Sequence, residues 1–465
     1  MLRISNHYIN KLSVMLLVIE AFILIASFYL GVALRFFTPG HALFPALPNL
    51  PPQALIFAAV MIFSMKAMGM YHLTYREDFR HTLLRLMPAF ALGFGLMTLT
   101  FYVAPDIYFG RGILGIVILL AAAGIILVRF AFCKGSKLNF LKPKIIVLGV
   151  GELARECANI AENNDSHHEF NIVGFVSIES EEPVISPSSL LPPGNSLLSL
   201  ATAYNVDEIV VAVQNQNSSN FPVQDLLECK LDGVKVIDAS TFFEREMSQI
   251  RVHSLNPNWL VFGGGFDQSG LRTAIKRAFD LFASTILLVA TLPVMLITAL
   301  CIYIQDRAPI LYRQERIGLG GRPFIVLKFR SMRHDAETAG KPQWASENDP
   351  RITRIGRIIR KLRIDELPQI VNVLKGDMSL IGPRPERDYF IKQLCEKIPY
   401  YNVRHSIKPG ITGWAQVRYQ YGSSIEDSVQ KLQYDLYYVK NNSLFLDIII
   451  LIDTVQVVLT GKGSR

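Results

Sequence analysis

Four long apolar runs dominate the first third of the chain. They cover residues 11–36, 52–70, 82–104 and 111–133. Each run is close to the roughly 20 apolar residues that an α-helix needs to cross about 30 Å of hydrocarbon. The pattern therefore predicts four membrane-spanning helices. A cleaved signal peptide is a weaker interpretation of the first run, because three more runs follow it and no small-residue cleavage site does.

The loops around these runs differ in charge. Lys and Arg gather before the first run, between the second and third, and after the fourth, whereas the other two loops carry almost none. Because basic loops stay on the cytoplasmic side of a membrane, the N-terminus and everything after the fourth run are expected in the cytoplasm. The chain is thus predicted to cross the membrane several times and to keep its soluble parts on one face.

Short buried-strand patterns alternate with helical patterns after the fourth run. The first strand pattern, from residue 144, runs into Gly149-Val150-Gly151 and then a helix, which is the G-x-G-x-x-A turn of dinucleotide-binding folds. Further strands are expected at 170–177, 208–213 and 234–238. The alternation predicts a Rossmann-like α/β domain.

Nucleotide binding by this domain is left open by the sequence. The acid expected to bind the ribose comes slightly late, at Glu179, and no Tyr-x-x-x-Lys pair stands out. A structural or regulatory module is therefore the alternative to a cofactor site.

A fifth apolar run, residues 281–304, has Pro293 at its centre. Proline removes a helical hydrogen bond and kinks the helix. Both flanks of the run are basic, so both ends are expected on the same face of the membrane. We therefore predict a re-entrant helical hairpin. The alternative, a plain fifth span, would place the basic segment that follows on the opposite side.

Two strands and a basic helix are predicted next. Residues 311–332 fit a strand pair joined by a glycine-rich turn, with Lys328 and Arg330 on one face of the second strand. The helix pattern that follows puts Arg354, Arg357 and Arg360 on one stripe, opposite most of its isoleucines. Such a stripe is also typical of helices that lie on anionic lipid headgroups, an alternative that we keep for its outer arginines.

The adjacent acids Asp365 and Glu366 follow this basic helix and precede Pro368 and an apolar helix pattern. A carboxylate in this position commonly caps the next helix, with proline in its first turn. The neighbouring cations favour another role, because they would keep a carboxylate ionised and would also attract phosphate. The sequence predicts a phosphate site here.

Composition narrows the class of protein. The chain has 465 residues, 50% of them hydrophobic, a net charge of +8 and a mean hydropathy of +0.29. Residues 307–363 carry the whole of the basic surplus, but no nucleic-acid-binding motif is present. The five cysteines have no CxxC spacing, which indicates reduced thiols and neither a zinc site nor a disulfide framework.

The C-terminal segments 429–440 and 444–460 are amphipathic or apolar, but the second contains Asp447 and Asp453. The two acids argue against a span, so interfacial helices on the inner leaflet are predicted. Ordinary packed helices that cover the catalytic core are the alternative.

Five motifs in order resemble the bacterial sugar transferase family, the monotopic phosphoglycosyl transferases. They are Lys328-Phe329-Arg330-Ser331-Met332, Arg360-x4-Asp365-Glu366-Leu367-Pro368-Gln369, Asn372-x-Leu374-x-Gly376-Asp377, Gly382-Pro383-Arg384-Pro385 and Pro409-Gly410-Ile411-Thr412-Gly413-Trp414. The resemblance covers about residues 270–465. The N-terminal part resembles the large, undecaprenyl-phosphate hexose-1-phosphate transferase branch, and the text after Trp414 resembles members linked to exosortase-associated exopolysaccharide loci.

This resemblance implies a multi-domain membrane protein of the bacterial inner membrane. We expect a four-helix transmembrane bundle over residues 1–140 and a Rossmann-like α/β domain over 141–262. An α/β monotopic catalytic domain would cover 263–465 and include the re-entrant hairpin at 281–304 and the interfacial C-terminal helices.

The implied reaction moves a sugar 1-phosphate from a UDP-sugar to undecaprenyl phosphate and releases UMP, initiating exopolysaccharide or O-antigen synthesis. The resemblance makes Asp365 the nucleophile, which would form an aspartyl-phosphosugar intermediate, and Glu366 the ligand of Mg²⁺. It implies that seven residues bind substrate: Lys328, Arg330, Arg360, Arg363, Gln369, Asp377 and Arg384. The expected partners are the UDP-sugar, undecaprenyl phosphate, membrane lipids and a second copy in a homodimer, with no nucleic acid.

One departure from the family text follows Val417, where the usual Asn-Gly-Arg is replaced by Arg418-Tyr419-Gln420. This leaves the sugar-phosphate contacts open. Two other functions are also weighed: a membrane-anchored nucleotide-sensing regulator or scaffold without catalysis, and an NAD-dependent sugar-nucleotide enzyme built on the middle domain. No motif specifies the hexose.

Overall fold

The structure is a computed structural model of the chain. It describes residues 2–4, 7–9, 11–36, 50–71, 79–135, 142–162, 170–178, 183–192, 196–213, 221–252, 265–266, 269–307, 309–333, 349–419, 422 and 424–460. The chain divides into two compact units, unit 1 with residues 1–4 and 8–246 and unit 2 with residues 5–7 and 247–465. The predicted three-domain division, with its boundaries after residues 140 and 262, stays a prediction.

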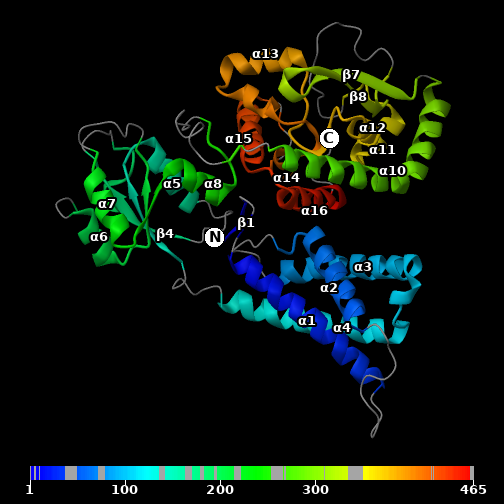
Figure 1. Ribbon diagram of the computed structural model, residues 1–465, viewed down its shortest axis with the longest axis horizontal. Helices are drawn as coiled ribbons and strands as arrows, with labels where there is room; N and C mark the ends of the chain where they lie inside the picture. Colours follow the sequence, from blue (N-terminus) through cyan, green and yellow to red (C-terminus); the bar gives the residue numbers. More distant parts are fainter. Residues whose placement is uncertain are drawn as a thin grey trace. The chain divides into compact units, whose positions relative to one another are not determined.

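Unit 1 contains the four apolar helices predicted from the first runs. They are α1 (Lys11–Phe36), α2 (Leu50–Ala67), α3 (Phe79–Val103) and α4 (Arg111–Gly135), preceded by the paired strands β1 (Leu2–Ile4) and β2 (His7–Ile9) (Figure 1). A short 3₁₀ turn, η1 (Pro105–Ile107), separates α3 from α4. Each helix is long and apolar enough to cross a membrane. Their shared core includes Phe28, Met61, Met97 and Val117, one residue from each helix.

A buried ion pair ties these helices together. Arg129 Nε of α4 donates to Glu20 Oε1 of α1 at 2.6 Å, and Arg129 NH1 donates to Met70 O at 2.8 Å. Glu20 is 0% exposed. Because a lone charge in an apolar interior is expensive, each partner makes the other tolerable. The pair therefore fixes how α1 and α4 meet.

The second part of unit 1 is a parallel sheet with helices around it (Figure 1). Its strands are β3 (Lys144–Leu148), β4 (Asn171–Val176), β5 (Glu208–Val211) and β6 (Lys235–Asp238), in the order β4-β3-β5-β6. The connecting elements are α5 (Glu152–Glu162), η3 (Pro187–Ser189), α6 (Leu197–Tyr204) and α7 (Val223–Leu231), and α8 (Ala239–Met247) follows. All four predicted strands are present. Each crossover between parallel strands needs a long connection, which these helices and loops supply.

The glycine turn of this sheet is covered by the chain's own backbone. Val184 N–H donates to Val150 O at 2.9 Å, and Leu191 N–H donates to Phe175 O at 2.9 Å. Residues 183–192 therefore run past the carboxyl ends of β3 and β4, where a nucleotide would bind in a dinucleotide fold. Glu179 lies outside the described residues, so the predicted ribose contact has no structural test.

The fifth apolar run lies in one long helix of unit 2, α10 (Gly270–Asp306), with Pro293 inside it. Figure 1 shows the ribbon of α10 turning partway along its length. Pro293 bends the helix without ending it, so the predicted bend is present, and the re-entrant arrangement in a membrane stays a prediction. A straight helix of this length would reach about 55 Å.

Both ends of α10 nevertheless pack on unit 2. Near its start, Arg277 NH1 donates to Val373 O at 2.6 Å and Asp280 Oδ1 accepts from Leu380 N–H at 3.2 Å. Near its end, Ile302 packs with Phe329 and Ile359. Only 11% of the residues in the most apolar part of α10 are buried, and the helix is long and apolar enough to cross a membrane.

Most of unit 2 packs around one large hydrophobic core, beside the smaller cluster that contains Ile302. Strands β7 (Leu311–Ile317) and β8 (Pro323–Phe329) form the predicted antiparallel pair, joined by η4 (Leu319–Gly321). They are followed by α11 (Arg354–Lys361), η5 (Ile364–Glu366), α12 (Gln369–Lys375), β9 (Ser379–Ile381), α13 (Asp388–Lys397), η6 (Tyr401–Ser406), β10 (Gly410–Thr412), α14 (Trp414–Arg418), α15 (Ile425–Asn441) and α16 (Leu444–Thr460). Strands β9 and β10 pair in parallel.

The C-terminal helices correct one prediction. Tyr437 and Tyr438 of α15 are 0% and 1% exposed, so α15 is a packed core helix and not an interfacial one. On α16, Asp447 accepts from Tyr438 Oη at 2.6 Å and pairs with Lys276 Nζ at 2.8 Å. The acid that argued against a span is thus a buried anchor for α10. Ile448 of α16 remains 44% exposed.

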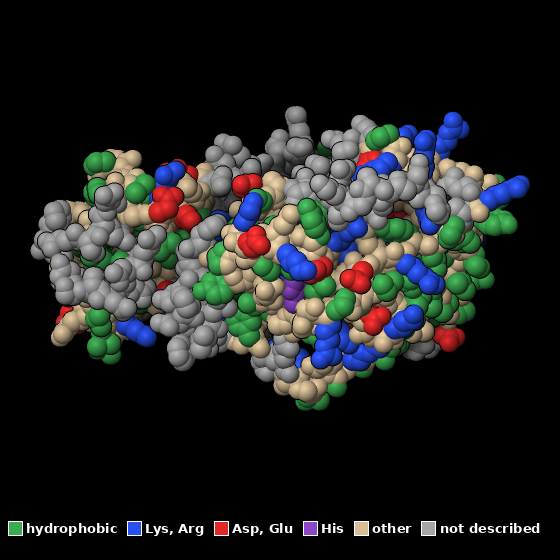
Figure 2. Space-filling view, turned by 90° about the horizontal axis from the view of Figure 1, so that it is seen from above, with side chains coloured by type: hydrophobic (Ala, Val, Ile, Leu, Met, Phe, Trp, Pro, Cys, Tyr) green, Lys and Arg blue, Asp and Glu red, His purple; other side chains and the backbone are tan. Residues whose placement is uncertain are grey.

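Helix α11 also departs from its predicted pattern. Ile359 is buried, but Ile358 and Leu362 are 59% and 54% exposed and lie among the exposed cations of this helix. Figure 2 shows one face of the molecule on which Lys and Arg side chains lie among hydrophobic ones. The two sides of α11 are therefore not cleanly segregated into cationic and buried apolar positions.

Candidate active site

The acid pair lies on η5, a single 3₁₀ turn between α11 and α12. Arg363 precedes it with a φ of 59°, a left-handed conformation that ends α11 and turns the chain. Helix α12 begins at Gln369 after Pro368 and has no side-chain cap. The alternative that Asp365 serves as a helix cap is therefore wrong, and Pro368 precedes the first turn of the helix rather than lying in it.

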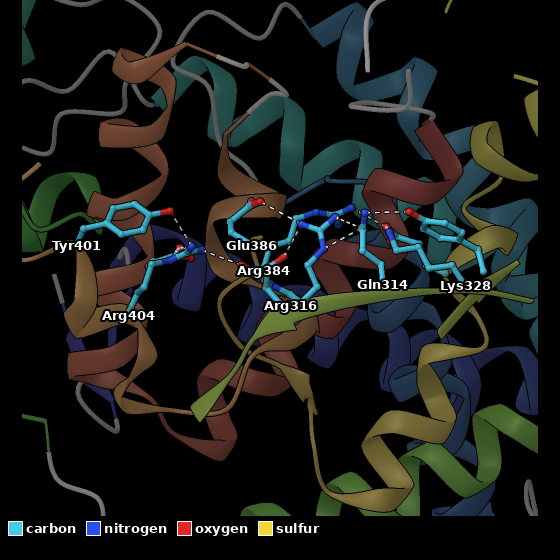
Figure 3. Close-up of polar contacts among 11 residues, drawn as sticks. Gln314, Arg316, Lys328, Arg384, Glu386, Tyr401 and Arg404 are labelled. Atoms are coloured by element: carbon cyan, nitrogen blue, oxygen red, sulfur yellow. Dashed lines mark hydrogen bonds and ion pairs between the residues drawn. The ribbon is translucent and has the colours of Figure 1, made fainter. Parts of the chain in front are cut away.

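Three cations surround the buried carboxylate of Glu366. Arg384 NH2, from the loop after β9, donates to Glu366 Oε1 at 2.7 Å, and Lys328 Nζ, from β8, donates to the same oxygen at 3.1 Å. Arg363 NH1 lies 3.8 Å from Glu366 Oε2. Glu366 is 8% exposed. Figure 3 shows that the side chains of Lys328 and Arg384 come from different parts of the fold.

These surroundings split the two neighbouring carboxyls. Burial alone would raise the pKa of Glu366, but Arg384, Lys328 and Arg363 together hold that pKa well below its ordinary value. Burial and the adjacent Glu366 charge raise the pKa of Asp365 to about 6, against the cations nearby. Glu366 is therefore the fixed anion of the pair, and Asp365 is the more basic carboxylate, suited to attack an electrophile.

The burial that isolates the acids also acts on the lysine beside them. Burial lowers the pKa of the Lys328 amine, while the Glu366 carboxylate raises it. Arg360, in the last turn of α11, is a further cation that lowers the pKa of Asp365. The site thus gathers positive charge from β8, α11, η5 and the loop after β9.

The loop that carries Arg384 depends on close backbone contact. A Cβ on Gly382 would collide with Lys408 O, and a Cβ on Gly410 would collide with Gly382 N. Gly382 N–H donates to Thr412 O at 2.9 Å, and Gly410 N–H donates to Pro383 O at 3.0 Å. The two glycine motifs of the sequence are therefore two sides of one contact, which holds Arg384 at the end of β9.

Several residues of this network were missed by the sequence analysis. Arg404 NH2 of η6 donates to Arg384 O at 2.9 Å and to Asp435 Oδ2 of α15 at 2.7 Å (Figure 3). Arg316 NH1 of β7 donates to Pro385 O at 3.2 Å and lies 3.3 Å from Glu386 Oε2. The two side-chain contacts join residues 31 and 70 positions apart, and the other two contacts end on backbone carbonyls. A local sequence pattern predicts neither kind of contact.

Three other predicted site residues fall differently, and Arg418, whose role the sequence left open, lies elsewhere. Gln369 is buried at the start of α12, directly after the acid turn. Arg330 follows the end of β8 and does not share that strand with Lys328; its NH1 is buried with no hydrogen-bond partner among the described residues. Asp377 is exposed beyond the far end of α12, so the structure does not bring it to the acid pair. Arg418 stacks on Trp414 at 4.3 Å and lies 3.6 Å from Asp453, apart from the cluster.

The residues present fit a magnesium ion that brings most of its own ligands. The described part of the chain has no group of three or more His, Cys, Asp or Glu that could cage a metal. Mg²⁺ is commonly held by one or two carboxylates, with phosphate oxygens and waters completing its octahedron. Asp365 and Glu366 match that donor set, but the ion would have to share Glu366 with Lys328 and Arg384.

Comparisons with known proteins agree with this site. Residues 271–461 match the family described as bacterial sugar transferase. The UDP-N-acetylgalactosamine-undecaprenyl-phosphate N-acetylgalactosaminephosphotransferase of Aeromonas hydrophila is 40% identical over 263 residues, which are 57% of this chain and 61% of that protein.

Two shorter matches are similar in identity. An uncharacterized sugar transferase of Bacillus subtilis (strain 168) is 42% identical over 195 residues, 41% of this chain and 90% of that protein. The UDP-glucose:undecaprenyl-phosphate glucose-1-phosphate transferase of Caulobacter vibrioides is 42% identical over 191 residues, 41% of this chain and 71% of that protein. The chain thus spans 61% of the Aeromonas protein and most of the Bacillus one.

Proposed function

Because the chain belongs to the bacterial sugar transferase family, we propose that it transfers a sugar 1-phosphate from a UDP-sugar to undecaprenyl phosphate and releases UMP. Relatives whose names state this type of reaction support the proposal. The observation that carries it is the split acid pair, in which Glu366 is pinned by Lys328 and Arg384 while Asp365 keeps a raised pKa.

In the first step, a carboxylate oxygen of Asp365 attacks the phosphorus that bears the sugar. The new bond is an acyl phosphate, and the bond that breaks joins this phosphorus to the bridging oxygen, which leaves with UMP. A nucleophile on the protein divides one displacement between two anions into two steps. The raised pKa of Asp365 favours this role because a more basic carboxylate is a better nucleophile once ionised.

In the second step, a phosphate oxygen of undecaprenyl phosphate attacks the same phosphorus. The bond to Asp365 breaks and its carboxylate is restored. The product is a lipid diphosphate that carries the sugar. No oxidant or other reactant is consumed, so the cycle closes on the two substrates alone.

The cations supply most of the stabilisation of charge. Two phosphates must meet at a site that already contains two carboxylates, and Lys328, Arg360 and Arg384 offset that repulsion. Arg330, with its buried and unpartnered NH1, is a further candidate to contact phosphate. Arginine suits this task because its planar fork matches phosphate oxygens.

We propose that Glu366 would hold Mg²⁺. When bound, the ion would neutralise phosphate charge as a Lewis acid. Lys328 and Arg384, which contact the same carboxylate, would lie beside the ion and the phosphates.

The acceptor is a membrane lipid, so the site must lie at headgroup depth. The exposed apolar side chains of α10, among them Phe282, Val289 and Ile297 at 68%, 68% and 63%, form a surface suited to hydrocarbon. Both ends of α10 pack on unit 2, so a helix that enters one leaflet and returns is favoured over a full span. We infer an inner-membrane protein with unit 2 on the cytoplasmic face. The homodimer and the role in exopolysaccharide or O-antigen synthesis stay predictions.

The proposal is tested by UMP release. Membranes that contain the full-length protein are supplied with undecaprenyl phosphate, Mg²⁺ and a panel of UDP-hexoses and their N-acetyl derivatives. Wild type should release UMP from at least one sugar, and Asp365→Asn should reduce the rate by at least about 1,000-fold, because the variant lacks a nucleophile. Trapped protein should carry a hydroxylamine-sensitive sugar-phosphate adduct on Asp365.

Glu396→Gln, an exposed acid on α13, is the matched control and should keep wild-type activity. Equal turnover by wild type and Asp365→Asn would refute the nucleophile. Absence of UMP release from every sugar in the panel, with folded protein in the membrane, would instead favour the non-catalytic regulator.

A further inference from the structure

Three consecutive backbone carbonyls of the loop that bears Arg384 are each held by a donor from elsewhere. Arg404 NH2 binds Arg384 O at 2.9 Å, Arg316 NH1 binds Pro385 O at 3.2 Å, and Ile317 N–H binds Glu386 O at 3.0 Å. The donors come from η6 and β7. A loop pinned at three successive peptides has little freedom, so the position of the Arg384 side chain is set from outside the loop.

Arg404 is the most confined of these donors. It is 5% exposed, and its guanidinium donates to acceptors of three residues. Besides Arg384 O, its Nε and NH2 donate to Asp435 Oδ2 at 3.1 and 2.7 Å, and its NH1 donates to Tyr401 Oη at 2.9 Å. The guanidinium is planar and rigid, so its bonds to Asp435 and Tyr401 fix its orientation before it binds Arg384 O.

We propose that Arg404, oriented by Asp435, is a positioning residue that holds Arg384 against Glu366. Arg404 touches neither the acid pair nor the substrate and acts through the backbone of Arg384. Its role extends the proposed transfer reaction and rests on it.

The proposal has a consequence for how the two arginines are coupled. Arg384 makes the shortest contact of Glu366, at 2.7 Å, and Arg404 reaches the acid pair only through the backbone of Arg384. If Arg404 acts by positioning Arg384, its substitution should have little further effect once the Arg384 side chain has been removed.

Arg404→Lys separates this role from simple loss of structure. Lysine keeps a positive charge beside Asp435, but its single ammonium cannot reach the three acceptors that the guanidinium fork joins. We expect kcat/KM for UMP release to fall by about 10- to 100-fold. We also expect less than about a twofold further loss when Arg404→Lys is added to Arg384→Ala, because the side chain that Arg404 positions is then already absent.

Two matched variants serve as controls. Tyr401→Phe removes one partner of Arg404 but leaves its contacts with Asp435 and Arg384, so kcat/KM should fall much less than in Arg404→Lys. Arg245→Lys alters another buried arginine, which binds both oxygens of Glu208 in unit 1 at 2.7 and 2.8 Å. It should lower the thermal midpoint, and any loss of kcat/KM that it causes should persist unchanged in the Arg384→Ala background.

A wild-type kcat/KM in Arg404→Lys, or a further loss of about tenfold or more when it is added to Arg384→Ala, would overturn the proposal and leave Arg404 a purely structural residue. If Arg404→Lys does not accumulate, the pair Arg404→Gln with Asp435→Asn, which removes both buried charges together, carries the same expectation. Failure of the transfer reaction itself is distinguishable, because wild type would then release no UMP.

Discussion

Asp365 and Glu366 are adjacent in the chain but have opposite surroundings. Glu366 receives Arg384 and Lys328 on one oxygen, whereas Asp365 experiences the charge of Glu366 and its own burial more strongly than the nearby cations. At the scale of single residues, the site is therefore a pair in which one acid holds the cations and the other retains basicity. The same contrast predicts opposite effects on stability.

Asp365→Asn should stabilise the protein near pH 7, and Glu366→Gln should destabilise it. The folded-state pKa of Asp365, about 6, lies above its ordinary value of 3.8, so ionisation costs stability; the cost is absent below pH 3.8 and complete above about 6. Its removal should add roughly 3 kcal/mol to the free energy of unfolding. Glu366→Gln leaves Lys328 and Arg384 without their anion and should cost roughly 2 kcal/mol.

Thermal unfolding of the two purified variants in detergent at pH 7.5 and pH 5 checks both signs. The gain in Asp365→Asn should shrink at pH 5, because part of the wild-type population is then protonated and already relieved of the cost. A loss of stability in both variants would contradict the separation of roles.

The transfer rate should depend on pH through Asp365. The attacking carboxylate must be ionised, so kcat/KM should fall about tenfold for each pH unit below about 6 and level off above it. A pH–rate profile of UMP release between pH 5 and 8 measures this limb. An acidic limb near pH 4 would show that Asp365 is not held at a raised pKa.

At the scale of elements, α10 is a bent helix whose two ends pack on the rest of unit 2. Lys276 and Arg277 fasten its first turns to α16 and α12, and Ile302 fastens its last turns beside β8 and α11. The apolar middle has few contacts with the protein. Both ends are therefore expected on the same side of the membrane.

Single cysteines placed at Leu271 and Arg307, in a background without the native cysteines, test this topology. Both positions are exposed. Each should react with a membrane-impermeant maleimide only when the cytoplasmic face is accessible, as in inverted vesicles. Labelling of the two positions from opposite faces would establish a full span.

Pro293→Ala should lower UMP release, because restoration of the missing hydrogen bond favours a straighter helix that cannot satisfy both anchors.

At the scale of the whole molecule, the charges of the two units serve different purposes. In unit 1, Glu20 and Arg129 pair inside the helical bundle, far in sequence from the acid pair of unit 2. The bundle pair joins α1 to α4, whereas the cations of unit 2 converge on two carboxylates. Stability of the bundle and chemistry of the site should therefore be separable by mutation.

Glu20→Gln tests this separation. The variant leaves Arg129 in the bundle interior without its anion and should lower the free energy of unfolding by roughly 3–5 kcal/mol. UMP release per folded molecule should remain at the wild-type level. Ser27→Ala, a neutral change at another buried position of α1, is the control for packing and should cost much less. Specific activity and thermal midpoint, measured on the same preparations, distinguish the two effects.

The local sequence pattern predicted the helices and strands of this chain well, but it predicted the contacts between them poorly. The four apolar runs, the strands of the parallel sheet and the β7–β8 pair all follow from periodicity, because burial imposes the same spacing on every helix or strand. The sequence left open whether α15 lies on a membrane surface or packs in the protein core, since an aromatic amphipathic face suits both environments equally. Pro293 indicated a bend, but its two anchors are contacts with distant residues.

By itself, the sequence determined that the chain is membrane-associated, that an α/β part follows the bundle, and that Asp365 and Glu366 are the candidate centre. It did so through composition, periodicity and contiguous motifs, which are local properties. Only the tertiary structure decided that Glu366 binds Lys328 and Arg384, that Asp365 is the more basic acid, and that Arg404 binds the backbone of Arg384. Those assignments depend on burial and on charges brought together from β8, α11, η6 and α15, and no spacing along the chain encodes distance in space.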